Sequence, residues 1–345
     1  MITNSIYNRN LPQSEKFKFN DSPEQMNEVI AGIDIGGTKI AIAFENLNGE
    51  KIAVRRLPTK VEIGAYAVIE TVSQAIEEML EDNQVKLVSI GIGCPSPLDI
   101  EKGLVMSPSN LQDWDNFPIV KLFGDRFRVP VLLDNDANTA ALGEYVYGAG
   151  RGYQNIVYIT VSTGIGGGII INGEIFHGVS AGAGELGHTI VQPDGIRCNC
   201  GSVGCLETIC AGIHIARRAR ERLAGGEPSI MNEMAANFDD VTAETVVEAV
   251  RRKDKLAIEI WDETCRVLAI GIANIITLLA PEAVVIGGGI AAAGDLLFAP
   301  LRRLLPEFVS MIPAEKINIL PAELGHESGV CGALVLAKKA YSKTY

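Results

Sequence analysis

The stretch "GIDIGGTKIAIAFENLNGE", residues 32–50, decides the fold class. Its glycine pair suggests a phosphate loop, but a loop of the Walker type needs Lys-Ser or Lys-Thr leading into a helix. Here Thr38 precedes Lys39, and a second apolar run follows in place of a helix. The pair Asn48-Gly49 is then a strong two-residue hairpin signal. The pattern predicts a tight glycine turn between two antiparallel strands.

The bulk composition narrows the function classes. The chain has 345 residues, 47% hydrophobic and 21% charged, which is ordinary for a globular enzyme and long enough for two domains. A formal net charge of -12 argues against a nucleic-acid partner, because phosphate backbones are bound mostly by clustered Lys and Arg. Residues 1–28 lack an apolar core of signal-peptide length, and the charge-free stretch 267–281 is too short to span a bilayer. We expect a flexible extension over 1–28, a cytoplasmic protein and no membrane partner.

The opening pattern recurs in "VYITVSTGIGGGIIINGEIF", residues 157–176. A strand, a glycine turn bearing a threonine, a second strand and an Asn-Gly-Glu turn follow in the same order in both stretches. Such self-similarity favours two related domains that face each other across a cleft, although two glycine-rich hairpins can also agree by coincidence. Strands alternate with helical patterns elsewhere, which predicts a mixed sheet covered by helices in each half.

The two glycine turns are candidates for binding a phosphate chain. Facing turns offer free backbone N–H groups, which bind phosphate without any lysine, and Thr38 and Thr163 add hydroxyls. Asp34 precedes the first turn, where Mg²⁺ can bridge a carboxylate and a phosphate. The alternative for Asp34 is an acidic turn residue that caps its own backbone. The combination favours ATP.

The stretch "LLDNDANTAALGE", residues 132–144, carries a candidate base. It places Asn135 and Asp136 where an apolar strand passes into a helix, a position from which side chains of open α/β sheets commonly reach a ligand. A carboxylate there can accept the proton of an attacking hydroxyl, which contributes roughly 10²- to 10⁴-fold to the rate. The alternative is that Asp136 only caps the helix.

The stretch "GAGELGHTIVQPDGIRCNCGSVGCLE", residues 182–207, predicts a metal site. The candidate ligands are His188, Cys198, Cys200 and Cys205. One His and three Cys form a closed tetrahedral set for Zn²⁺, and reduced cysteines without a metal are the alternative. A closed site has no open position for activated water, so the zinc is expected to be structural. It would hold Glu185, His188 and Glu207 toward a ligand rich in hydroxyls.

Six motifs together resemble the ROK family of repressors and sugar kinases, most closely its bacterial glucokinases. They are "DIGGTK", "LLDNDANTAALGE", "STGIGGG", "GELGH", "CNCGSVGCLE" and "VVIGGGI", and the match runs from about Val29 to the C-terminus. The resemblance implies an α/β protein with a two-lobed, actin-like and ribonuclease-H-like fold. Residues 29–139 plus 329–345 would form the small lobe, and 140–328 the large lobe with the zinc-binding insertion. It also implies a homodimer or homotetramer.

The resemblance further implies an activity and a role for each motif. A glucokinase transfers the γ-phosphate of ATP to the 6-hydroxyl of glucose, here with Asp136 as general base, Mg²⁺ on the nucleotide and structural Zn²⁺. The implied sugar contacts are Asn110, Asn135, Asp136, Glu185, His188 and Glu207. The implied ATP contacts are Asp34, Gly36, Gly37, Thr38, Lys39, Thr163, Gly164, Gly287, Gly288 and Gly289.

One departure and three alternatives stay open. In "GCPSPLD" Ser96 stands where the family usually has glycine, so it either changes the substrate range or only repacks the turn. The same motifs fit N-acetylmannosamine kinases, N-acetylglucosamine kinases and fructokinases. A sugar-responsive repressor needs a helix-turn-helix domain, for which residues 1–28 hold too few apolar side chains. A zinc-stabilised sugar-binding protein without turnover is disfavoured by the base and the phosphate turns.

Overall fold

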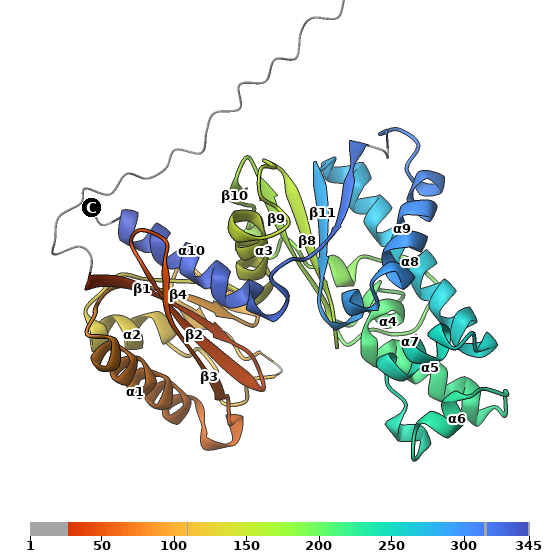
Figure 1. Ribbon diagram of the computed structural model, residues 1–345, viewed down its shortest axis with the longest axis horizontal. Coiled ribbons are helices and arrows are strands. Elements are labelled where there is room, and N and C mark those ends of the chain that lie inside the picture. Colours follow the sequence, from red (N-terminus) through yellow and green to blue (C-terminus); the bar gives the residue numbers. More distant parts are fainter. Residues whose placement is uncertain (1–26, 109, 314–315, 344–345) are drawn as a thin grey trace, which may run out of the picture.

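The computed structural model describes residues 27–108, 110–313 and 316–343. Two five-stranded sheets form its frame, and helices cover their faces (Figure 1). The extension expected over residues 1–28 lies outside the described residues except for its last two. Of these, Glu28 already starts the first strand, where its carboxylate lies 2.8 Å from the Lys86 ammonium.

The first sheet has the strand order β3-β2-β1-β4-β7. Its strands are β1 (Glu28–Ile35), β2 (Lys39–Asn46), β3 (Lys51–Pro58), β4 (Lys86–Cys94) and β7 (Val131–Asn135). The first two strands are antiparallel, with Ile35 opposite Ile40, as the glycine turn predicts. The strands β1, β4 and β7 run parallel, and buried side chains fill both faces of β1 and β4.

Helices α1 (Ala65–Asn83) and α2 (Ile119–Phe127) cover one face of this sheet (Figure 1). Their apolar side chains recur at helical spacing and pack against β1 and β4 in one core cluster. A small hairpin, β5 (Leu98–Asp99) and β6 (Leu104–Val105), lies beyond the end of β4.

The second sheet has the order β10-β9-β8-β11-β12. Its strands are β8 (Ile156–Val161), β9 (Ile165–Ile171), β10 (Glu174–Ile175), β11 (Ala283–Gly287) and β12 (Asn318–Pro321). An antiparallel hairpin and three parallel strands follow in the same order as in the first sheet. The duplication that the sequence predicts is therefore confirmed.

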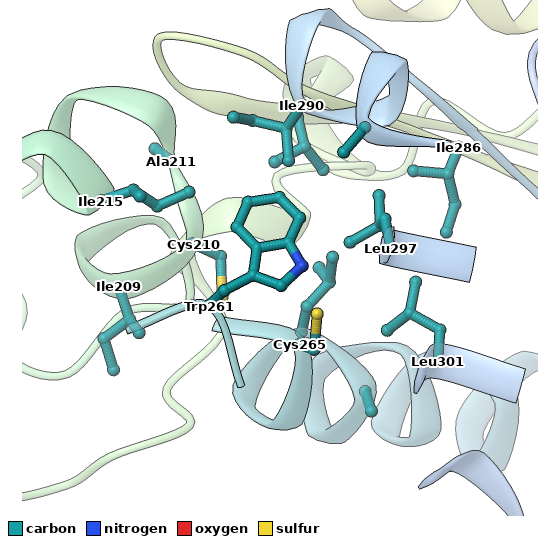
Figure 2. Packing of buried hydrophobic residues seen from close by; sticks show 14 of the residues in the cluster. Ile209, Cys210, Ala211, Ile215, Trp261, Cys265, Ile286, Ile290, Leu297 and Leu301 are labelled. Carbon is teal, nitrogen blue, oxygen red and sulfur yellow. The ribbon is translucent and has the colours of Figure 1, made fainter. Parts of the chain in front are cut away.

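The outer face of the second sheet is covered by the helices between β10 and β12. They are α4 (Glu207–Cys210), α5 (Gly212–Ala224), α6 (Met231–Met234), α7 (Ala243–Arg251), α8 (Lys255–Leu279) and α9 (Asp295–Phe308). Trp261 lies at the centre of their core, among Cys210, Ile290 and Leu297 (Figure 2). Its indole N–H donates to the Leu296 carbonyl at 2.9 Å, so burying the ring leaves no orphan donor.

Short 3₁₀ turns occupy the connections. They are η2 (Val61–Ile63), η3 (Val179–Ala181), η4 (Leu186–His188), η5 (Phe238–Asp240), η6 (Gly289–Ala293) and η8 (Gly325–Glu327). None of the helices in the described ranges combines the length and apolar character that a membrane crossing requires.

Helices α3 (Asp136–Tyr147) and α10 (Ser328–Ser342) form the layer between the two sheets (Figure 1). The helix α3 starts at the end of β7 but packs on β8 and β9, whereas α10 packs on β1 and β4. The two helices also touch each other, because a Cβ at Gly332 would lie 1.5 Å from the Thr139 carbonyl oxygen. The expected lobe boundary at 139–140 falls inside α3. This helix follows directly from a strand of the first sheet, but it packs mainly on the second sheet.

Candidate active site

A cleft of about 770 Å³ lies between the two glycine turns and is lined from both halves of the chain. Thirteen of the residues singled out in the sequence line it: Asp34, Gly36, Lys39, Ser96, Asn135, Asp136, Thr163, Gly164, Glu185, His188, Glu207, Gly288 and Gly289. Gly37, Thr38, Asn110 and Gly287 are not part of this lining, although Gly37 lies against Asn110 and Gly287 ends β11 beside the cleft. The three cysteines lie behind His188.

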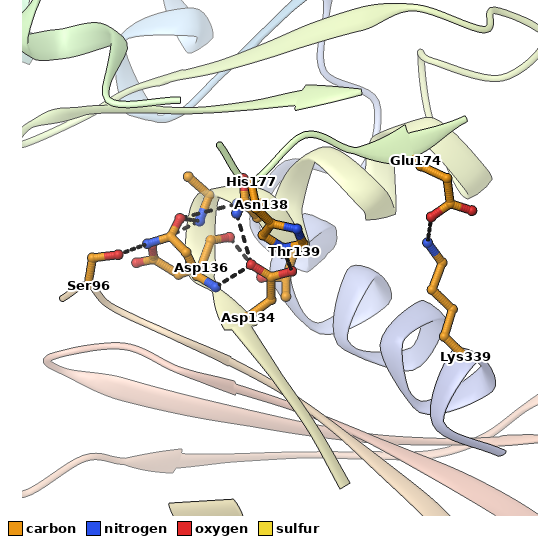
Figure 3. A network of polar contacts seen from close by, with 10 residues as sticks. Ser96, Asp134, Asp136, Asn138, Thr139, Glu174, His177 and Lys339 are labelled. Atoms are coloured by element: carbon orange, nitrogen blue, oxygen red, sulfur yellow. Dashed lines mark hydrogen bonds and ion pairs between the residues drawn. The ribbon is translucent and has the colours of Figure 1, made fainter. Parts of the chain in front are cut away.

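Asp136 is the first residue of α3, and the cap of this helix is its neighbour Asn135. The Asn135 side-chain oxygen accepts from the N–H groups of Ala137 and Asn138 at 2.9 and 3.2 Å. Its amide nitrogen donates to the Ser96 hydroxyl at 2.8 Å (Figure 3). Asn135 thus fills the capping role considered for Asp136, and the carboxylate of Asp136 is left facing the cleft.

Burial raises the pKa of Asp136, although the Ala137 N–H, which donates to its carboxylate at 2.8 Å, partly opposes this shift. A second carboxyl lies nearby. Burial, and then the negative charge of Asp136, raise the pKa of Asp34 to about 7, against the opposing charge of Lys39. Two buried acids that disfavour each other's ionisation fit a bound divalent cation, because its charge removes that penalty.

The second glycine turn is held from outside by Glu207. The Glu207 carboxylate accepts from the Ile165 N–H at 2.8 Å, and a Cβ at Gly164 would lie 2.8 Å from the same oxygen. Gly288 has a φ of +84°, and a Cβ there would lie 2.3 Å from the Val161 carbonyl oxygen. Only glycine lets the end of β11 approach the end of β8 so closely. The result is a cleft wall made largely of backbone.

The four candidate metal ligands converge as expected from their spacing. One donor atom from each of His188, Cys198, Cys200 and Cys205 lies within 4.8 Å of the others. The His188 Nδ1 lies 3.6 Å from the Cys198 sulfur, and the sulfurs of Cys200 and Cys205 are 3.6 Å apart. Tetrahedral zinc with thiolate and imidazole ligands separates its donors by about 3.4–3.8 Å. The geometry therefore fits Zn²⁺.

The pKa values of two of the cysteines are shifted in opposite directions. The backbone N–H of Ser202 is the main cause that lowers the pKa of Cys200 to about 7, whereas burial raises the pKa of Cys205 to about 12. The other ring nitrogen of His188 lies 3.9 Å from a carboxylate oxygen of Glu185. His188 thus turns one nitrogen to the cysteines and the other toward a cleft residue.

Several cleft residues escaped the sequence reasoning. They are Tyr158, Thr160, Ser162, His326 and Gly329. Thr160 pairs with Gly287 one step before the end of its strand, as Asp34 pairs with Gly93, so superposing the two repeats would have found it. His326 carries no such signal, because it follows no strand and belongs to no motif.

The segment around His326 is positioned by Glu144, a fully buried acid of α3. Its carboxylate accepts from the N–H groups of Glu323 and Leu324 at 3.0 and 2.9 Å and from the Ser328 hydroxyl at 2.8 Å. A buried carboxylate that accepts several hydrogen bonds fixes the segment that supplies the donors. The last acid of the "LLDNDANTAALGE" stretch therefore shapes the cleft from behind.

Comparison with known proteins agrees with this site. The ROK family model matches residues 30–340. A glucokinase of Halalkalibacterium halodurans is 36% identical over 315 residues, which cover 89% of this chain and 94% of that protein. The structure of a ROK family glucokinase from Streptomyces griseus in complex with glucose and AMPPNP is 32% identical, with a TM-score of 0.75, covering 90% of this chain and 99% of that chain.

Relatives with other names are also similar. An N-acetylmannosamine kinase of Escherichia fergusonii is 32% identical, covering 89% of this chain and 97% of that protein. A xylose repressor of Caldicellulosiruptor bescii is 27% identical, covering 89% of this chain and only 77% of that protein. Since the family model spans nearly all of the described residues, the chain belongs to the ROK family.

Proposed function

We propose that this protein is an ATP-dependent glucokinase, which transfers the γ-phosphate of ATP to the 6-hydroxyl of glucose. The observation that carries the proposal is the carboxylate of Asp136, buried in a cleft whose opposite wall is the second glycine turn. Bacterial glucokinases are 32–36% identical to this chain, and the similar Streptomyces griseus structure contains glucose and AMPPNP.

Asp136 acts as the general base in this proposal. Its raised pKa brings the carboxyl closer to the working pH, where a base is most effective. It accepts the proton of the 6-hydroxyl as the oxygen attacks phosphorus, and the leaving group is ADP. The proposed sugar contacts are Asn110, Asn135, Asp136, Glu185, His188 and Glu207. Of these, Asn135 caps α3 and Glu207 accepts from the Ile165 N–H of the second glycine turn, so both side chains are already fixed.

The nucleotide is proposed to lie along the glycine turns. The backbone N–H groups of Gly37 and the 163–164 turn, the hydroxyls of Thr38 and Thr163 and the ammonium of Lys39 would bind the phosphates. Gly36 would shape the turn, since its N–H donates to the Lys39 carbonyl at 3.0 Å. The turn at 287–289 would lie near adenosine. Mg²⁺ on the phosphates neutralises charge during transfer, and Asp34 would hold it directly or through water.

The zinc is proposed to be structural. Four protein ligands leave no open position, so its role is to fix the loops that carry Glu185 and Glu207. The proposed location is the cytoplasm, because a thiolate zinc site needs reduced cysteines and the reaction needs ATP. We further propose that residues 29–139 plus 329–345 and residues 140–328 act as two lobes that close over the substrates, in a homodimer or homotetramer.

Initial rates at equal sugar concentration test the proposal. Purified protein with Mg²⁺ and ATP should phosphorylate glucose faster than mannose, fructose, N-acetylglucosamine or N-acetylmannosamine. A preference for N-acetylmannosamine would instead favour the activity of the Escherichia fergusonii relative. Binding to promoter DNA in a gel shift, without ATP consumption on any of these sugars, would contradict the enzyme and favour a repressor.

A further inference from the structure

The carboxylate of Asp134 lies directly behind the proposed base and is almost fully buried, at 3% exposure. One of its oxygens accepts from the Asn135 N–H and from the Asn138 side-chain amide, both at 2.8 Å. The other oxygen lies 2.7 Å from Nε2 of His177 (Figure 3). A buried carboxylate needs such partners, because its desolvation is otherwise too costly.

The first two partners connect Asp134 with the turn that carries the base. Asn138 is a buried residue in the first turn of α3, and Asp136 lies between it and Asp134 in the chain. The Thr139 hydroxyl closes the same turn by donating to the Asp136 carbonyl oxygen at 2.8 Å. The position of the Asp136 carboxylate is therefore set by bonds that start at Asp134.

The third partner comes from the other half of the molecule. His177 follows β10, and its carbonyl oxygen accepts from the Ala183 N–H at 2.9 Å, which closes a loop. That loop leads to Glu185, a proposed sugar contact, and Ala181, Ala183 and Gly184 within it also line the cleft.

Backbone strain in this loop shows that its shape is imposed by contacts. Ser180 and Ala181 both have positive φ angles, of 54° and 55°. Residues other than glycine rarely adopt this conformation, and two in succession persist only where surrounding bonds over-determine it. The bond from His177 to Asp134 and the bond from Ala183 to His177 are two such constraints.

We propose that the contact between His177 and Asp134 is a positioning contact, which holds the sugar-binding loop and the base-carrying turn at a fixed distance from each other. The inference rests on the proposed sugar kinase function. His177 touches neither substrate in this view, so it acts through Asp134 and through its own loop. Breaking the contact should weaken sugar binding and misplace the base, with little effect on ATP binding.

The charges around His177 give this contact a pH dependence. Its ring contacts Asp134 of β7 and also experiences the positive charge of Lys339 of α10, which is paired with Glu174 of β10 (Figure 3). The hydrogen bond to Asp134 raises the pKa of His177 above the ordinary 6.5, against burial and Lys339. Once the pH rises through this raised pKa, the ring loses its charge and the contact weakens. The KM for sugar should then increase.

The test compares three variants with the wild type. His177→Ala removes the contact, whereas His177→Gln keeps an amide donor that cannot titrate. Glu174→Gln is the matched control, because it breaks the neighbouring ion pair with Lys339 without touching the base-carrying turn. For each, kcat and the KM values for glucose and ATP are measured from pH 6 to 9, together with the rise in Tm that glucose produces.

We expect His177→Ala to raise the KM for glucose and to lower kcat/KM by about ten- to a hundredfold, with the KM for ATP unchanged. His177→Gln should lie closer to the wild type and lack the increase of KM at high pH. An unchanged glucose KM in folded His177→Ala, or an equal loss in Glu174→Gln, would overturn the inference. If His177→Ala does not fold, the pH profile of His177→Gln decides. An inactive wild type would instead refute the proposed function.

Discussion

The two sheets share one topology but carry different chemistry at equivalent positions. Asp34 and Thr160 occupy the same place in β1 and β8, one step before the glycine turn, and both line the cleft. At this position the first half supplies a carboxylate and the second half a hydroxyl. Duplication thus provides a symmetric frame in which single residues at equivalent positions differ in their chemistry.

The connections differ as much as the strands agree. In the first half, β3 is followed by α1 after six residues that contain one 3₁₀ turn. In the second half, the chain between β10 and α4 contains only η3 and η4, and the four converging His and Cys ligands occur there. A long segment with little regular structure has few backbone bonds of its own, so a metal is an effective way to fix it.

The largest effect is expected when the proposed base, which only the first half of the chain supplies, is replaced. Asp136→Asn should lower kcat by roughly 10²- to 10⁴-fold, because the amide cannot accept the proton of the sugar hydroxyl. The fold should persist, since Asn135 and not Asp136 caps α3. Coupled ATP assays and glucose titration would measure both properties, with the exposed Asp125→Asn as control. Turnover close to that of the wild type would remove Asp136 from the mechanism.

Removing the metal tests whether it fixes the long connection between β10 and α4. We expect about one zinc per chain, and its chelation should cost more than about 3 kcal/mol of stability and lower the activity. Cys200→Ser should reproduce the loss, whereas Cys331→Ala, a thiol far from the cluster, should keep the metal. Metal analysis and urea unfolding provide the readouts. Freshly purified protein without any metal would contradict the site.

Asp34 and Thr160 occupy equivalent positions, but only Asp34 titrates. A pH-dependent contribution to the free energy of unfolding is therefore expected from the first half alone. The unfolded carboxyl of Asp34 ionises near 3.8, but in the folded protein its pKa is about 7. Between these values the unfolded state binds fewer protons, so this group lowers stability as pH rises in protein free of Mg²⁺ and nucleotide. Asp34→Asn should therefore gain about 2–3 kcal/mol relative to the wild type between pH 5 and pH 8.

Urea unfolding at the two pH values measures this gain. Thr160→Val changes the equivalent position of the second half without a titrating group, and its difference from the wild type should not depend on pH. A constant difference for Asp34→Asn would show that its carboxyl ionises normally in the folded protein.

The smallest effect concerns the layer that both halves share. Gly332→Ala should cost about 1–3 kcal/mol, because the new methyl group forces α10 away from the Thr139 carbonyl. Gly124→Ala in α2 is the matched control: a Cβ there meets no atom closer than 4.0 Å and should gain about 0.5–1 kcal/mol of helix propensity. Thermal unfolding compares the two. Equal Tm values for the two variants would mean that α3 and α10 move apart to fit the new methyl group at no cost in stability.

The sequence predicted those parts of the structure that depend on local pattern. The glycine turns, the repeated hairpins and the cluster of His188 with the three cysteines each lie within one short stretch. Their spacing alone brings the groups together. The lobe boundary at 139–140 stays a prediction, and the packing of α3 on β8 and β9 is a contact that helical periodicity does not specify.

The contacts missed from the sequence are those between distant segments. Nothing near Asp134 points to His177, and nothing near Glu144 points to the segment at 323–328, because each partner comes from a separate element. Asn135 was predicted only as a sugar contact. Its bond to Ser96 depends on a loop 39 residues upstream, whereas its bonds to the first turn of α3 are local and form the cap that Asn commonly provides.

The docking of α10 has a consequence for how the chain folds during synthesis. The helix leaves the ribosome long after the strands that it covers, because the Ser89 hydroxyl donates to the Ala337 carbonyl across 248 residues. Until α10 packs on the sheet, the side chains of Ile30, Ala43 and Leu47 lack the apolar contacts that this helix provides. A nascent or prematurely terminated chain therefore exposes an apolar, aggregation-prone sheet face. Chaperones bind such surfaces.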